Sequence, residues 1–217
     1  MTLSEDSKFR QFPCDVFVFL VSHFSLTTTT TMSSSSSSTS GLLLQYKTLS
    51  LDVADEIASK AIQTAKDNGF NPIAICVLDH AGNPIVAKRM DGCPNRAYAT
   101  IAEHKANTCV RMKKSSRAYG DKYLPDDATP GKIVRILSQI ASNEGEIASF
   151  PGGVVIKCAE SGQILGAVGA SGAAGDEDEY CAWSGVKQSA IANIVETDPK
   201  DHSCTTIKTL KRQKTEE

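Results

Sequence analysis

The chain has 217 residues, of which 41% are hydrophobic and 22% are charged, as is usual for a globular protein. This length allows one ordinary domain with extensions. The formal net charge is −2, from 25 acidic and 23 basic residues, so the chain lacks the positive field that nucleic-acid binding requires. We therefore expect one folded domain and no nucleic-acid partner.

Seven cysteines are spread along the chain, and none forms a C-x-x-C pair of the kind that binds zinc. Cys76 and Cys158 lie in apolar strand patterns, where a reduced and buried thiol is expected. Free thiols are typical of a reducing compartment, so this usage favours a cytoplasmic protein.

Residues 1–46 differ from the rest of the chain and are predicted to form a disordered leader. The runs Thr27–Thr31 and Ser33–Ser38 cannot bury a core. The apolar stretch over residues 12–26 is interrupted by polar residues and falls short of the roughly 20 apolar residues of a membrane span. We expect no membrane partner, while an N-terminal targeting segment stays open. Met32 is a candidate alternative start, because everything foldable follows it.

The first predicted helix covers residues 50–68. Its apolar residues recur at i, i+3, i+4 and i+7 and therefore line one face. Ser50 can cap the start of this helix and Gly69 its end. Two strands follow, over residues 73–78 and 84–90, and the polar turn between them predicts a hairpin.

A second helix is predicted over Asn95–Met112, because small and apolar residues fall on a common side. The stretch Lys113–Asp127 is polar and aromatic, and we expect it to be irregular. Thr129 and Pro130 resemble a helix cap followed by a first-turn proline, which predicts a shorter helix that ends at Ser142.

The most glycine-rich stretch runs from Phe150 to Ala182. Within it, Val154–Cys158 and Gln163–Ala170 are predicted strands, and Gly162 supplies the turn between them. Glycines within the second strand remove side chains where something approaches the backbone closely. They indicate either tight packing or a ligand site.

The last predicted helix covers Asp176–Val195, with Asp176 as its cap and Glu179 in capping-box position. Residues 197–217 are expected to form a loose polar tail, which leaves residues 47–196 as the folded domain. The order helix, hairpin, two helices, hairpin, helix favours an α+β fold. We expect a single antiparallel sheet of about five strands with helices packed on it.

Several motifs follow one another along this domain: Arg89-Met90-Asp91-Gly92, Ala102-Glu103-His104-Lys105-Ala106, Pro151-Gly152-Gly153, and Ile164–Gly172 followed by Asp176–Glu179 and Cys181-Ala182. Together they resemble the GlcG/HbpS family, also called the haem-degrading-domain family, which includes the C-terminal domain of the PduO corrinoid adenosyltransferases. The resemblance covers residues 49–194. It implies a profilin-like sheet, assembly as a homo-oligomer, and haem or a related tetrapyrrole as the ligand.

The resemblance also implies a ligand pocket drawn from the residues Arg89, Asp91, Lys105, Pro151, Gly152, Gly153, Ser171 and Gly172. Arg89 or Lys105 would neutralise propionates or a substrate carboxylate, and the glycines would let the ligand reach backbone donors. His104, which is not part of the family pattern, is the first candidate for an axial iron ligand, and His80 is the second.

Several of these residues also have a simpler structural explanation. Arg89 and Asp91 could pair with each other or cap the following helix. A lone helix histidine such as His104 is more often exposed. The acidic run Asp176–Glu179 could ligate a hard cation, but helix capping and the helix dipole already account for it.

Two other classes of function stay open. The chain could be a cofactor-independent enzyme that acts on a small acid or carbonyl compound, with Lys105 and Asp91 as acid–base candidates. That class requires Lys105 to be buried with a lowered pKa. Alternatively, the glycine-rich hairpin could serve only to pack against a sister subunit.

Overall fold

The computed structural model describes residues 45–124 and 129–202. The expected leader over residues 1–46, with its alternative start at Met32, lies almost wholly outside the described residues, and so does the end of the predicted tail. Among the residues that are described, no helix is both long and apolar enough to cross a membrane.

The centre of the fold is one antiparallel sheet of five strands in the order β2-β1-β4-β3-β5. The strands are β1 (Ala74–Asp79), β2 (Pro84–Arg89), β3 (Gly153–Cys158), β4 (Ile164–Ser171) and β5 (Val195–Asp198). The two predicted hairpins are both present, and they join through β1 and β4, where Val77 lies opposite Val168. The predicted α+β class with one antiparallel sheet is therefore confirmed.

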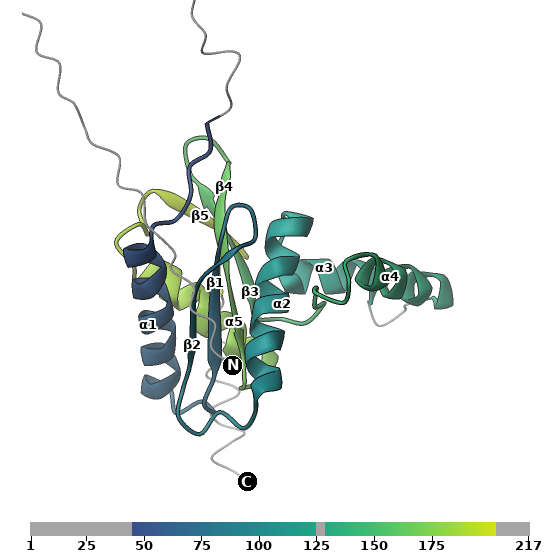
Figure 1. Cartoon of the computed structure of the whole chain (residues 1–217), viewed down its shortest axis with the longest axis horizontal. Helices are drawn as coiled ribbons and strands as arrows, with labels where there is room; N and C mark the ends of the chain where they lie inside the picture. The colour runs from purple at the N-terminus through teal and green to yellow at the C-terminus, as the bar shows by residue number, and fades with distance from the viewer. Residues whose placement is uncertain (1–44, 125–128, 203–217) are drawn as a thin grey trace, which may run out of the picture. The chain divides into compact units, whose positions relative to one another are not determined.

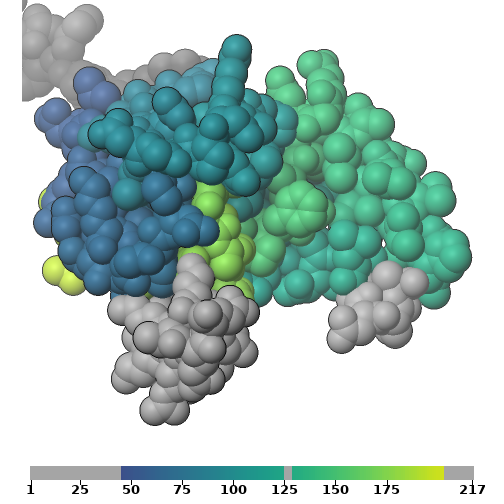
Figure 2. All heavy atoms as spheres, turned by 90° about the horizontal axis from the view of Figure 1, so that it is seen from below, coloured from purple at the N-terminus to yellow at the C-terminus, as the bar shows by residue number. Residues whose placement is uncertain are grey.

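Helices cover both faces of the sheet (Figure 1). The helices are α1 (Leu51–Asp67), α2 (Arg96–Met112), α3 (Ser116–Tyr123), α4 (Pro130–Ser142) and α5 (Gly175–Lys187). Alternation along β1 divides the core, because Ile75 and Val77 pack with α1 and α5 while Cys76 and Leu78 pack with α2. The α3–α4 arm (green) lies on the opposite side of the sheet from α1 (blue) in Figure 1, and Figure 2 shows the blue and green atoms at opposite sides of the view.

The first helix begins and ends where its sequence predicts. The Ser50 hydroxyl accepts a hydrogen bond of 3.4 Å from the backbone N–H of Val53, which satisfies a donor that the helix leaves unpaired. Gly69 follows the helix at a φ of +65°, a left-handed conformation that glycine adopts without steric cost.

The stretch expected to be irregular contains a helix, α3. Ser115 caps it by accepting a hydrogen bond of 3.1 Å from the N–H of Ala118. Tyr119 and Tyr123, one helical turn apart, are buried together against Ile136 of α4 in a small third core. The prediction was wrong here because the pattern is only two turns long and its buried residues are tyrosines among charged neighbours.

The last helix is shorter than predicted and begins earlier. Its cap is Ala174 and not Asp176, and the Glu177 carboxylate accepts the N–H of Ala174 at 3.1 Å. The helix ends at Lys187, and the chain then forms strand β5 against β3. In β5, Val195 and Thr197 are buried and Glu196 between them is exposed, as in a strand with one buried face. Four residues are too few for this alternation to be recognised in the sequence.

Candidate functional site

The glycines of the central hairpin make room for helix α2. A Cβ atom at Gly153 would lie 2.5 Å from the carbonyl oxygen of Lys105. A Cβ atom at Gly169 would overlap the Ala102 carbonyl oxygen, because the two atoms would be much closer than their van der Waals contact distance. Of the two explanations that the glycine pattern allows, tight packing holds at both positions, because a helix backbone occupies the space.

Lys105 is buried in this helix–sheet contact, with an exposed fraction of 3%. Its Nζ donates hydrogen bonds to the Ala170 carbonyl oxygen at 2.8 Å and to Oδ2 of Asp178 at 2.9 Å. The other carboxylate oxygen of Asp178 accepts the N–H of Ala173 at 3.0 Å. Burial raises the pKa of the Asp178 carboxyl above its ordinary value, although the Lys105 charge opposes this rise. Gly152 lies directly over the amine, because a Cβ there would be 2.7 Å from Nζ.

The rest of the acidic run is also paired. Arg117 of α3 forms ion pairs with Asp176 and with Glu179, the latter at 2.8 Å, and Glu179 is 2% exposed. Burial raises the pKa of the Glu179 carboxyl, and Arg117 opposes this rise. No group of three or more metal-ligating side chains occurs within the described ranges. The acidic run therefore ties α2, α3 and α5 together, a role that the sequence analysis missed.

Lys105 and Asp91, the candidate acid–base pair, are not brought together. The lysine is buried, as an enzyme would require, but its carboxylate partner is Asp178 and Asp91 is exposed in the loop after β2. A lysine on the apolar side of a helix needs a buried anion, and this requirement is the signal that could have pointed to Asp178.

The remaining glycine-stretch candidates lie close to this pair. Ser171 ends β4 and is buried opposite Ala74 of β1. Gly172 has a φ of +140°, and a Cβ there would be 2.9 Å from the Cα of Ile73. A Cβ atom at Gly175, the first residue of α5, would lie 3.4 Å from the Cβ of Pro151. These residues form the junction between the sheet and α5.

Arg89 lies at the end of β2, where its guanidinium donates a hydrogen bond of 2.8 Å to the Cys93 carbonyl oxygen. It forms no ion pair with Asp91 among the described residues, and α2 is capped by Asn95, which accepts the Ala97 N–H at 2.8 Å. Neither simpler explanation accounts for Arg89.

Arg89 lines two pockets at this end of the sheet. One, of about 460 Å³, lies between β2, β1 and the first half of α2, and Arg96 and Glu103 also line it. The other, of about 410 Å³, lies on the α1 side and contains Lys66 and Asp91. Of the predicted site residues, Arg89 therefore lines both of these pockets and Asp91 lines one.

The two candidate iron ligands differ in their surroundings. His104 is half-buried on α2 and lines neither of the two Arg89 pockets nor the pocket around His80. His80, in the loop between β1 and β2, stacks on Tyr46 with 5.3 Å between ring centroids. Its Nδ1 is buried without a hydrogen-bond partner among the described residues. His80 lines a pocket of about 410 Å³ together with Tyr46, Val110, Lys113, Lys157, Gly162, Gln163 and Ile164.

The largest of these pockets has a volume of about 740 Å³. It and the His80 pocket share the segment before α1 as a wall, because Tyr46 lines the His80 pocket and Lys47 lines the larger pocket. Hydrogen bonding holds this segment to the sheet, since Leu49 N–H donates to the Leu165 carbonyl oxygen at 3.3 Å. The larger pocket is mainly apolar and includes Leu49, Val53, Cys158, Leu165, Ile191 and Ile194.

The class of protein is α+β, with one five-stranded antiparallel sheet covered by helices, and solved structures share this fold. A family model described as haem degrading protein HbpS-like matches residues 49–187, and the chain belongs to this family. The family resemblance of the sequence motifs is thereby confirmed.

Individual relatives are similar at a lower level. A Citrobacter freundii protein, described as an uncharacterized 15.0 kDa protein in the dhaT-dhaS intergenic region, is 28% identical over 141 residues, which are 64% of this chain and 89% of that protein. A crystal structure of a double mutant of Streptomyces reticuli HbpS has a TM-score of 0.55 at 25% identity and covers 67% of this chain and 89% of that chain.

A crystal structure described as a PduOC:Heme complex has a TM-score of 0.56 at 22% identity, over 68% of this chain and 96% of that chain. At that identity the likeness concerns the fold alone.

Proposed function

We propose that this protein binds haem or a related tetrapyrrole, with His80 as the axial ligand of the iron. The observation that carries this proposal is the imidazole of His80, which lines a pocket and forms no side-chain hydrogen bond with a described residue. Membership of the HbpS-like family makes a tetrapyrrole the first ligand to test.

The residues around His80 fit such a ligand. Haem iron is commonly held by a histidine nitrogen, and cofactor pockets are lined mostly by apolar side chains. Val110, Ile164 and the ring of Tyr46 supply apolar surface, while Lys113 and Lys157 could each pair with a propionate. A pocket of about 410 Å³ is within the usual range for small-molecule sites.

This proposal reverses the order in which the two histidines are candidates for the iron ligand. His104 lies outside the described pockets, so His80 becomes the first iron ligand to test. Lys105 is held by Asp178 and is replaced as a propionate partner by the two lysines at the pocket. Bound haem would supply the redox and ligand-binding chemistry of its iron, and the protein would orient it and shield one face from water.

The test is an absorbance titration of hemin into the full chain and into His80→Ala, with His104→Ala as the matched control. We expect a saturable Soret shift that is lost or weakened at least about tenfold in His80→Ala and retained in His104→Ala. The paired variant Lys113→Gln/Lys157→Gln should weaken binding while keeping the spectral position, because the iron ligand is unchanged.

Two results would refute this site. A shift that survives His80→Ala but disappears in Cys158→Ser would place the ligand in the larger apolar pocket, because a thiolate also ligates haem iron. The absence of any saturable shift would refute tetrapyrrole binding itself.

Self-association is part of the proposal. Helix α4 presents Ile133, Val134 and Leu137 to solvent, and Val134 is 63% exposed. Apolar side chains clustered on a projecting helix are typical of a contact surface. Light scattering after size-exclusion chromatography, with Leu137→Glu as the variant, should show a smaller assembly for the variant than for the unmodified chain.

A further inference from the structure

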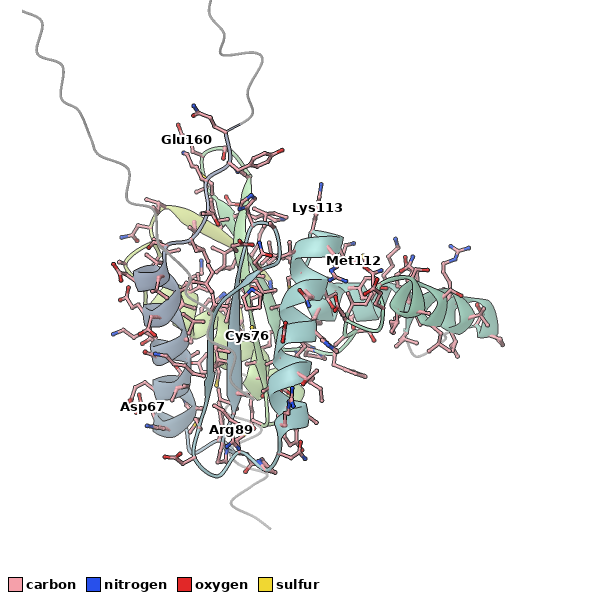
Figure 3. The ribbon with its side chains drawn as sticks, in the orientation of Figure 1. Asp67, Cys76, Arg89, Met112, Lys113 and Glu160 are labelled. Atoms are coloured by element: carbon pink, nitrogen blue, oxygen red, sulfur yellow. The ribbon has the colours of Figure 1, made fainter. Side chains whose placement is uncertain are left out.

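The pocket between β2 and α2 is separate from the proposed tetrapyrrole site. Arg89 lies at one end of the sheet, whereas Lys113 lies at the opposite end (Figure 3). The pocket has walls from three elements: Cys76 on β1, Arg89 on β2, and Arg96 and Glu103 on α2. Its volume of about 460 Å³ suits a small organic molecule.

Three charged side chains around this cavity have no charged partner. The side chains of Arg96 and Glu103 form no ion pair or hydrogen bond with any described residue, and the Arg89 guanidinium donates one hydrogen bond to the Cys93 carbonyl oxygen. A guanidinium has five N–H donors, so most of the Arg89 donors stay available. Arginine and glutamate side chains that line one cavity without pairing leave both charges for a ligand.

The other polar groups of the pocket are already occupied or neutral. Lys88 is paired with Asp55 at 2.7 Å and donates to the Ser59 hydroxyl at 2.8 Å. Burial raises the pKa of the Cys76 thiol to about 12, so this floor residue carries no charge near neutral pH. The available charges are therefore two guanidiniums and one carboxylate.

We propose that this pocket binds a small amino acid with an acidic side chain. Two guanidiniums suit two carboxylates, because arginine binds a carboxylate through two parallel hydrogen bonds. The Glu103 carboxylate suits the ammonium group of the same molecule. This inference goes beyond tetrapyrrole binding and uses none of the residues that would hold the haem.

The experiment is isothermal titration calorimetry on the full chain with three probes: L-glutamate, L-alanine and succinate. L-Glutamate binds most tightly because it alone carries two carboxylates and an ammonium group. Arg96→Gln weakens the binding of L-glutamate by about tenfold or more, which corresponds to the loss of about 1.4 kcal/mol of binding free energy. Glu103→Gln weakens the binding of L-glutamate similarly but leaves the affinity for succinate unchanged or higher. A general structural defect would weaken the binding of both ligands.

The control variant is Arg135→Gln, an exposed arginine on α4 that lines none of the pockets described above. It leaves L-glutamate binding unchanged, and circular dichroism verifies that all variants are folded. The proposal is overturned if no probe gives saturable heat, or if L-glutamate and succinate bind equally and Glu103→Gln affects neither. Titration of Arg96→Gln with hemin distinguishes the two sites. If the variant loses L-glutamate binding but binds hemin normally, the effect of the substitution is confined to the pocket between β2 and α2.

Discussion

Replacing Lys105 by methionine would remove the amine of a buried ion pair while keeping most of the side-chain volume. The carboxylate of Asp178, 2% exposed, would then keep the Ala173 N–H as its one hydrogen-bond donor among the described residues. Breaking a buried pair in this way costs about 3–5 kcal/mol, because one charge stays in the interior without compensation. For a domain of this size, that loss lowers the melting temperature by roughly 6–20 °C.

Lys88→Met is the matched control. Lys88 pairs with Asp55 at 2.7 Å, slightly closer than Lys105 and Asp178, but the two side chains are 31% and 53% exposed. Solvent screens such a pair, so its loss should cost no more than about 1 kcal/mol. Urea unfolding followed by circular dichroism gives both free energies of unfolding.

The double variant Lys105→Met/Asp178→Leu tests the physical cause. It removes both charges, so most of the stability lost in Lys105→Met should return. The reasoning is refuted if Lys105→Met costs no more than Lys88→Met. It is also refuted if the double variant is less stable than Lys105→Met, because the uncompensated carboxylate would then not be the source of the loss.

Two further predictions concern the same part of the fold. Gly169→Ala should destabilise the protein by about 1–3 kcal/mol or more in urea unfolding, because the added Cβ would overlap the Ala102 carbonyl oxygen. The control is Gly131→Ala, whose added Cβ meets no atom within 4 Å, and its stability should change by less than about 1 kcal/mol. Equal effects of the two would show that α2 can move away at no cost. Burial raises the pKa of Glu179 above its ordinary 4.5, so the folded state holds this proton more tightly and loses stability as pH rises from 4.5 through the folded pKa. Glu179→Gln cannot titrate, so its stability relative to the unmodified chain should rise over that window, and a flat or falling difference would contradict the assignment.

Local sequence patterns predicted the helices and strands that are long enough for a pattern to repeat within them. Helix α1 has four turns of apolar spacing and a serine cap, and both hairpins combine β-branched strands with polar or glycine turns. Strand β5 has four residues and is a strand only because it pairs with β3, where Val155 lies opposite Asp198. No local pattern in the sequence predicts that Val155 pairs with Asp198, because the two residues lie far apart in the chain.

The candidate site was predictable to a similar extent. The polarity of Lys105 on an apolar helix face indicated a buried amine, but its partner Asp178 lies 73 residues further along the chain. The glycines indicated a close approach, and the group that approaches is the backbone of α2. The choice between His104 and His80 depends on Tyr46, Val110 and Ile164, which only the folded chain brings together.

The position of the Lys105–Asp178 pair also affects how binding experiments are interpreted. The pair joins α2 to the start of α5, and α2 supplies Val110 to the His80 pocket and Glu103 to the Arg89 pocket. A Lys105 variant that loses both hemin and L-glutamate binding would therefore indicate a displaced helix and not a lost ligand contact. Loss of one ligand alone, in a variant with normal stability, is the result that assigns a residue to a site. His80→Ala and Arg96→Gln are suited to this test because each changes a residue that lines one of the two proposed binding pockets and not the other.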